Sequence, residues 1–111
     1  CADVNGNIYV SGCFEETVNF AVDWNDFDTK TSVGGGDVFV TKIENSGTYG
    51  LSYRIGGTSE DDVSSIFVDN SGAVFITGTF EGEIDFAQDF GVIDRKTSTG
   101  NKDIFITKIL P

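Results

Sequence analysis

The chain repeats itself with a period of 66 residues, and this repeat constrains the fold more than any other feature of the sequence. The segment from Asp3 to Phe20 recurs from Asp69 to Phe86. The register continues without a gap until Thr41-Lys42-Ile43, which falls on Thr107-Lys108-Ile109. Self-similarity at a fixed period is typical of repeat folds, in which neighbouring units bury a shared core. The 111 residues contain one full period and about two thirds of the next.

The repeated segments have the composition of β-strands. Glycine (14) and phenylalanine (10) are frequent, and no segment places apolar residues at helical spacing over several turns. Turn sequences such as Asn5-Gly6 separate the apolar runs. The pattern predicts polar loops at residues 21–36 and 87–102, and strands at Ile8–Gly12, Thr17–Phe20, Asp37–Ile43, Tyr49–Ile55, Val63–Asp69, Ala73–Thr79, Glu83–Phe86 and Asp103–Leu110.

The apolar runs differ in a way that favours one all-β architecture. Val38-Phe39-Val40 and Ile104-Phe105-Ile106 are apolar at consecutive positions, which is typical of strands with both faces buried. Tyr49–Ile55 alternates instead, as expected of an exposed outer strand. We therefore predict antiparallel β-propeller blades. The strands of a blade would run outward from Val63–Asp69 through Ala73–Thr79 and Asp103–Leu110 to a strand like Tyr49–Ile55. The alternative is a β-sandwich, with polar residues at alternate outward positions.

Three linked motifs resemble a known family. They are Asp-x-x-Gly-x-Val-Phe-Ile-Thr-Gly-x-Phe at residues 69–80, Ile-Asp-Phe at 84–86, and Thr-Ser-x-Gly-x-x-Asp-Ile-Phe-Ile-Thr-Lys-Ile at 97–109. Together they are similar to the bacterial β-propeller repeat family called SBBP. The resemblance covers nearly the whole chain. It implies a propeller fold within a large secreted or surface-attached bacterial protein, and it implies no catalytic residues.

The repeat divides the chain into two units. Residues 1–55 form a first propeller repeat that lacks its innermost strand, and residues 56–111 form a second that lacks its outermost strand. A propeller needs at least about four blades to close, so we expect an incomplete propeller of about two blades. Uncovered strands and faces are templates for association. We therefore expect the partners to be further blades of the same polypeptide or other protein chains. We also expect that residues 1–111 alone are not a stable isolated monomer.

Charge and residue types exclude several functions. The formal net charge is −11, which argues against nucleic acid and anionic membrane surfaces as partners. The chain has no histidine, so it holds no Ser-His-Asp or Cys-His pair. No apolar run reaches the length of a membrane span. Cys1 and Cys13 are placed too far apart in the expected hairpin for a disulfide, and a lipidated Cys1 stays open.

One acidic loop has the alternating oxygen groups that calcium prefers. Asp23, Asn25, Asp26 and Asp28 lie within six residues, and carboxylate and amide oxygens are the ligands of that ion. The second unit keeps only Asp89 and Asp94 of this pattern. We therefore treat calcium as a possible ligand here and expect no other cofactor, with a polar loop tip as the alternative.

Other side chains admit a functional and a structural interpretation. Glu60, Asp61 and Asp62 at the junction of the units could supply the paired carboxylates of a glycoside hydrolase, although acidic loop clusters are usually solvated. Asp37 and Asp103 precede strands and should accept backbone N–H groups. Trp24 with Tyr49 and Tyr53 could stack on a sugar, but Trp24 should rather cover the core.

These features together favour a non-catalytic function. We expect a binding or scaffolding module of a secreted or cell-surface bacterial β-propeller protein, acting in protein or glycan interaction or in extracellular assembly. The alternative is part of a carbohydrate-active enzyme whose catalytic groups lie partly outside this chain.

Overall fold

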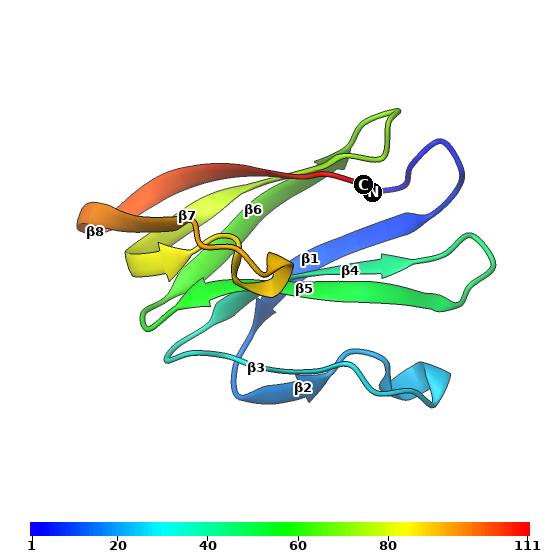
Figure 1. The fold of residues 1–111 in the computed structure, drawn as a ribbon, viewed down its shortest axis with the longest axis horizontal. Helices are drawn as coiled ribbons and strands as arrows, with labels where there is room; N and C mark the ends of the chain where they lie inside the picture. The colour runs from blue at the N-terminus through cyan, green and yellow to red at the C-terminus, as the bar shows by residue number, and fades with distance from the viewer.

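The computed structural model describes residues 1–111 and is built of antiparallel strands (Figure 1). The strands are β1 (Ile8–Phe14), β2 (Thr17–Asn19), β3 (Thr29–Thr31), β4 (Asp37–Ile43), β5 (Tyr49–Gly57), β6 (Asp61–Val68), β7 (Val74–Asp85) and β8 (Arg95–Ile109). Two single 3-10 turns complete the fold, η1 (Val22–Trp24) and η2 (Gln88–Phe90). The all-β prediction is confirmed, and neither helical turn is long and apolar enough to cross a membrane.

The strands form two three-stranded ladders. In the first ladder β4 lies between β1 and β5, and in the second β7 lies between β6 and β8. These neighbours are the ones that the sequence predicted for Val63–Asp69, Ala73–Thr79 and Asp103–Leu110. Strand pairing joins the two ladders only at the end of β5, where Gly56 and Gly57 pair with Asp85 and Ile84 of β7.

The two ladders stack face to face (Figure 1). Cross-strand partners share a face, so the ladder registers place one face of β1, β4 and β5 against one face of β6, β7 and β8. The core between them comprises Tyr9, Val38, Val40, Ile55, Val68, Val74, Ile76, Phe80, Ile84, Phe86, Phe105 and Ile109. The β2–β3 hairpin lies on the opposite side of the first ladder (Figure 1). The chain therefore has a layered order of hairpin, first ladder and second ladder.

Two predicted loops are partly strands. Residues 21–36 contain β3, which pairs with β2, and residues 87–102 contain the first half of β8, which pairs with the end of β7. β7 is also continuous over the two strands predicted at Ala73–Thr79 and Glu83–Phe86. The loop prediction was wrong because these strands are polar and mostly exposed. Strands that are held by backbone hydrogen bonds need no periodic apolar residues, so the sequence pattern did not reveal them.

The first residues of the chain lie beside β1. Ala2 forms an isolated bridge with Ile8, and Cys1 and Tyr9 exchange backbone hydrogen bonds of 2.9 and 2.8 Å. One period later, Val68 pairs with Val74 in the same way. Cys1 and Ala2 therefore occupy the end of an innermost-strand position. Cys1 and Cys13 are both free thiols.

The sheets do not close on themselves. Two stacked antiparallel ladders fit a pair of propeller blades and also fit a β-sandwich. The distinction depends on the two outward faces and on the free edge of β8.

Candidate interaction site

The outward side of the second ladder carries four large apolar side chains. Phe67, Ile104 and Ile106 have exposed fractions of 61%, 78% and 78%. The ring of Phe75 lies beside Phe67, with 6.3 Å between centroids. We call these four residues the outer face. Contiguous apolar side chains exposed on one sheet face mark an interaction surface.

Three of the four equivalent positions in the first unit, Tyr9, Val38 and Val40, are buried. Ile104 and Ile106 fall on Val38 and Val40 after one period, and those two valines are 0% and 1% exposed. The second ladder covers them. The outer face is therefore the copy of a surface that, one unit earlier, is covered by a repeat unit.

At the other end of the stack, residues of the first unit are exposed and their equivalents in the second unit are buried. Val74 and Ile76 are 4% and 0% exposed because they pack against the first ladder, whereas their equivalents Ile8 and Val10 are 46% and 43% exposed. This side of the first ladder carries the β2–β3 hairpin, where the ring of Phe20 contacts Phe14 and Phe39 at 5.2 and 5.0 Å. The equivalent cluster in the second unit is Phe80, Phe86 and Phe105. We call the side with Ile8, Val10 and the β2–β3 hairpin the hairpin face.

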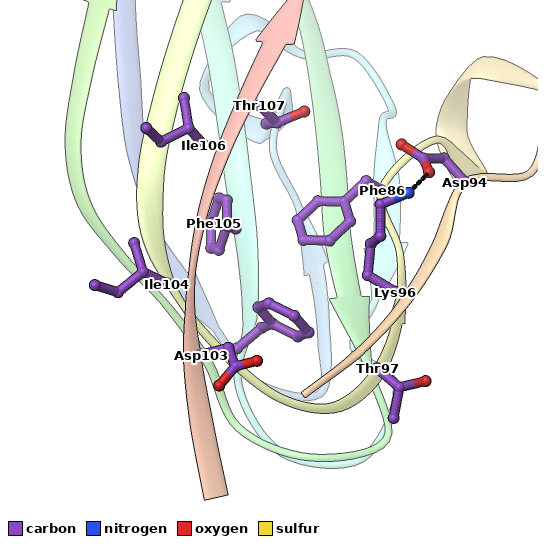
Figure 2. Close-up of a pocket in the computed structure, with 10 residues that line it drawn as sticks. Phe86, Asp94, Lys96, Thr97, Asp103, Ile104, Phe105, Ile106 and Thr107 are labelled. Carbon is purple, nitrogen blue, oxygen red and sulfur yellow. Dashed lines mark hydrogen bonds and ion pairs between the residues drawn. The ribbon is translucent and has the colours of Figure 1, made fainter. Parts of the chain in front are cut away.

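The free edge of β8 borders two hollows. The first, of about 390 Å³, is shown in Figure 2 and is lined by Phe80, Phe86, Asp94, Lys96, Thr97 and residues 103–107. The second, of about 360 Å³, is lined by Tyr53, Phe86, Ala87, Phe90, Val92, Asp94 and residues 107–111. The two hollows share Phe86, Asp94 and Thr107, so they form one groove along the strand. We call it the edge groove.

Asp94 is held in the edge groove by a repeated hydrogen-bond frame. Asp85 Oδ1 accepts the N–H groups of Asp94 at 2.9 Å and Ala87 at 3.0 Å. Lys96 pairs with Asp94 Oδ1 (Figure 2). In the first unit, Asn19 Oδ1 accepts the N–H groups of Asp28 and Ala21, and Lys30 pairs with Asp28. The second unit therefore builds the same carboxylate position as the first.

Asp37 and Asp103 have the structural role that the sequence predicted. Asp37 Oδ2 accepts the N–H of Val33 at 3.0 Å, and Asp103 Oδ2 accepts the N–H of Thr99 at 3.0 Å. Asp37 is fully buried and its Oδ1 has no partner. Burial raises the pKa of the Asp37 carboxyl to about 6. The prediction that both residues accept backbone N–H groups is confirmed.

Glu60, Asp61 and Asp62 lie together beside a depression of about 440 Å³ that also contains Cys13, Glu15 and Lys102. Asp61 is 2% exposed and accepts the N–H of Gly57 at 2.8 Å. Burial raises the pKa of Asp61. Asp62 accepts hydrogen bonds from the Cys13 thiol at 3.0 Å and the N–H of Val63 at 2.8 Å, and these lower its pKa.

The two aspartates do not form a facing pair. They are neighbours in β6, and successive side chains of a strand leave on opposite faces. Burial, followed by the hydrogen bond with Asp62, raises the pKa of the Cys13 thiol to about 11, so this thiol is not an activated nucleophile. Asp61 and Asp62 therefore offer one buried carboxyl and one exposed carboxylate that do not face a shared target.

The predicted calcium residues point to different partners. Asp28 pairs with Lys30 at 3.0 Å and accepts hydrogen bonds from Tyr49 and Ser52. Asp26 accepts the N–H of Phe27, and Asn25 ends η1 in the left-handed conformation with φ 56°. No group of three or more Asp, Glu, Cys or His side chains is placed to share a metal ion. The calcium site at Asp23, Asn25, Asp26 and Asp28 stays a prediction that this geometry does not favour.

The aromatic residues proposed for sugar stacking are separated. Trp24 contacts Tyr49 with 5.6 Å between ring centroids and donates its indole N–H to Gly47 at 2.7 Å. Tyr53 faces the other way and packs on Phe90 of the second unit at 4.4 Å. The three rings therefore share no common surface.

These observations define an antiparallel all-β protein of two stacked repeat units with an open face at each end. A scan against models of known families, a search of curated proteins and a search of solved structures each find no match. The resemblance to the SBBP repeats therefore stays a hypothesis carried by the motifs alone.

Proposed function

We propose that the chain is a non-catalytic interaction module made of two blades of a β-propeller-type array, in which the outer face binds the hairpin face of another unit of the same kind. Following the motif resemblance, we place it in a secreted or cell-surface bacterial protein, where it serves extracellular assembly by protein interaction. Glycans remain a second class of ligand in this proposal.

The observation that carries this proposal is the difference in burial between equivalent residues. Val38 and Val40 are buried by a neighbouring unit, whereas Ile104 and Ile106 are 78% exposed. A β-sandwich hides its apolar side chains between its two sheets and alternates polar residues outward. Apolar residues on an outward face favour further stacking instead, with the same contact repeated from unit to unit.

The contact is heterologous, because the outer face and the hairpin face are different surfaces. Burying an isoleucine or phenylalanine side chain stabilises an interface by about 1.5–3 kcal/mol, so covering the outer face contributes several kcal/mol. A head-to-tail contact of this kind generates a ring where the rotation closes and a filament where it does not.

We expect the chain of residues 1–111 to self-associate. Light scattering should give a mass that rises with concentration above the 11.9 kDa of one chain. The double variant Ile104→Asp/Ile106→Asp should be monomeric at the same concentrations, because a docked carboxylate would be buried without a partner. A cooperatively melting monomer of the unaltered chain would contradict the proposal.

Val4→Asp is the matched control. Val4 is 67% exposed, but it lies in the turn before β1 and belongs to neither face. The substitution introduces one negative charge, half of the charge that the double variant adds, without touching the proposed contact, so the mass distribution should equal that of the unaltered chain. Equal dissociation by both variants would show that net charge, and not the outer face, governs association.

A carbohydrate-active enzyme is the second candidate. Neighbouring groups whose pKa values are pushed apart are a feature of acid–base sites, and Asp61 and Asp62 show opposite shifts. The lack of a facing geometry argues against this function.

We expect no turnover on a panel of glycans, and no change when Glu60, Asp61 or Asp62 is replaced by alanine. The assay should use the longest natural polypeptide that contains these residues. Turnover that is lost in any of the three variants would replace the binding function by the enzymatic one.

A further inference from the structure

We propose that the edge groove binds an extended polypeptide strand with the pattern Tyr-x-x-Ser-x-Arg, antiparallel to β8. The inference uses the same repeat equivalence as the proposed function, but it concerns the polar groups along the free edge of β8. Ile104 and Ile106 border both this groove and the outer face. The occupant is a strand of another polypeptide segment, identified by the groups that the groove presents.

One edge of β8 is unpaired and can add a further strand. β8 pairs with β7 alone, whereas its equivalent β4 pairs with β1 on one side and β5 on the other. An edge strand presents a row of unpaired N–H and C=O groups, which add a further strand by main-chain hydrogen bonds. The register of β4 with β5 indicates which residue would lie opposite each position of β8.

The polar partners of β5 define the tyrosine and the serine. Thr41 pairs with Ser52, and their hydroxyls are 2.6 Å apart. Asp28 Oδ2 accepts hydrogen bonds from the Tyr49 hydroxyl and, at 3.2 Å, from the N–H of Ser52. The Tyr49 hydroxyl oxygen also lies 2.8 Å from Ser52 Oγ, within hydrogen-bond distance. One aspartate and one threonine thus recognise a tyrosine and the serine three residues later.

Both recognising groups recur in the edge groove. Asp94 and Thr107 fall on Asp28 and Thr41 after one period, and both line the hollow beside β8 (Figure 2). Asp94 is held by the same backbone frame as Asp28. Its only side-chain partner is Lys96, through Oδ1, which leaves Oδ2 open. The groove therefore presents the acceptor that Tyr49 and Ser52 use in the first unit.

A third group defines the arginine. Arg54 lies opposite Phe39 and places its Nε 3.9 Å from Asp37 Oδ2. Asp103 is the equivalent of Asp37 and lines the first hollow (Figure 2). An arginine two residues after the serine would therefore lie near Asp103. The charge of such a strand also fits, because its arginine brings one positive charge to a chain with a net charge of −11.

The binding test uses the full chain and a synthetic peptide of residues 48–57, which carries the β5 sequence. We expect saturable binding by calorimetry, with amide NMR shifts along residues 103–109. Asp94→Asn in the chain, and Tyr49→Phe in the peptide, should each weaken binding about tenfold or more. Asp94→Asn removes the charge that strengthens the hydrogen bond, and Tyr49→Phe removes the hydroxyl that donates it. The two changes together should weaken binding by a smaller factor than the product of their separate factors, because both act on the same hydrogen bond.

Asp23→Asn is the control variant. Asp23 is exposed on the first unit and outside the groove, so it removes one charge without touching the site and should leave the affinity unchanged. The absence of binding at millimolar peptide, or binding that Asp94→Asn and Tyr49→Phe do not weaken, overturns the proposal.

A covalent version tests the same site when peptide affinity is low. A copy of residues 46–57 attached after Pro111 keeps the register of β5, because Leu110 and Pro111 fall on Glu44 and Asn45. The extended chain should melt at a higher temperature than the unextended chain. Tyr49→Phe/Ser52→Ala within the attached copy should remove most of this gain. No gain in melting temperature would contradict a strand site.

The two proposals fail separately. Ile104→Asp/Ile106→Asp tests stacking through the outer face, whereas Asp94→Asn tests the edge. Peptide binding by a chain that does not self-associate would support the strand site and reject the stacking function. Self-association without peptide binding would support the stacking function and reject the strand site.

Discussion

Replacing Gly78 by alanine is expected to lower the free energy of unfolding by about 3 kcal/mol or more. Gly78 is buried in β7, between β6 and β8. A Cβ atom built there would lie 2.0 Å from the carbonyl oxygen of Asp62. That oxygen belongs to the backbone of β6 near an irregularity in the register between Val63 and Ser65. A strand backbone cannot move aside without breaking its ladder, so the strain is not easily relieved.

Gly12→Ala is the matched control, because Gly12 occupies the same position one period earlier. Its Cβ would meet the ring of Phe39 at 2.9 Å, and no backbone atom comes as close. The Phe39 ring is partly exposed and can shift. We therefore expect a loss of about 1 kcal/mol or less for Gly12→Ala. Urea unfolding at one fixed protein concentration measures both losses. Equal losses would contradict the difference in backbone approach.

Asp37→Asn is expected to remove a pH dependence of stability between pH 4 and pH 7. Burial raises the pKa of Asp37 in the folded chain from the ordinary 3.8 to about 6, and the charge of Asp61 acts in the same direction while Arg54 opposes it. The folded state therefore binds a proton more tightly than the unfolded chain. This favours the folded state at low pH, and the contribution is lost as the pH rises from about 4 through 6.

The change between pH 4 and pH 7 is about 3 kcal/mol at most, since one pKa unit corresponds to about 1.4 kcal/mol. Asparagine keeps an oxygen for the N–H of Val33 and carries no charge. Asp37→Asn should therefore gain stability relative to the unaltered chain as the pH rises. Asp61, whose pKa is also raised by burial, leaves a smaller slope of the same sign in the variant.

Urea unfolding at several pH values between 4 and 7 checks this expectation. Asp103→Asn is the control, because Asp103 makes the same bond to a backbone N–H from a partly exposed position. It should leave the pH profile close to that of the unaltered chain. A profile for Asp37→Asn that runs parallel to that of the unaltered chain would show that the Asp37 carboxyl is not the titrating group.

The candidate interaction site could be predicted from the sequence only in part. The apolar run Ile104-Phe105-Ile106 correctly indicated a strand, but only Phe105 is buried, and the predicted burial of both faces is not found for Ile104 and Ile106. The sequence did not identify Asp94 or Thr107, which we propose as binding groups. Their roles depend on the hydrogen bonds of Asp28 and Thr41 with Tyr49 and Ser52 in the folded first unit. Those residues are 11–24 positions apart along the chain.

The polar hairpins show why the prediction of loops at residues 21–36 and 87–102 was wrong. β3 and the first half of β8 are held by backbone pairing, assisted by contacts such as the 3.0 Å pair of the Thr17 and Thr31 hydroxyls. Such pairing has no periodicity of apolar residues to reveal it. The predicted loops therefore became strands only where a partner segment lies alongside.

By itself, the sequence determined the all-β class, the 66-residue repeat and the order of neighbouring strands, because turn residues and apolar runs act over a few positions and repeat with a fixed period. Only the tertiary structure decided which copy of each repeated residue is covered. Val38 and Ile104 are nearly identical in sequence context, yet one is 0% and the other 78% exposed. Burial depends on which unit has a neighbour on that side, and this is a property of the stack and not of the local sequence.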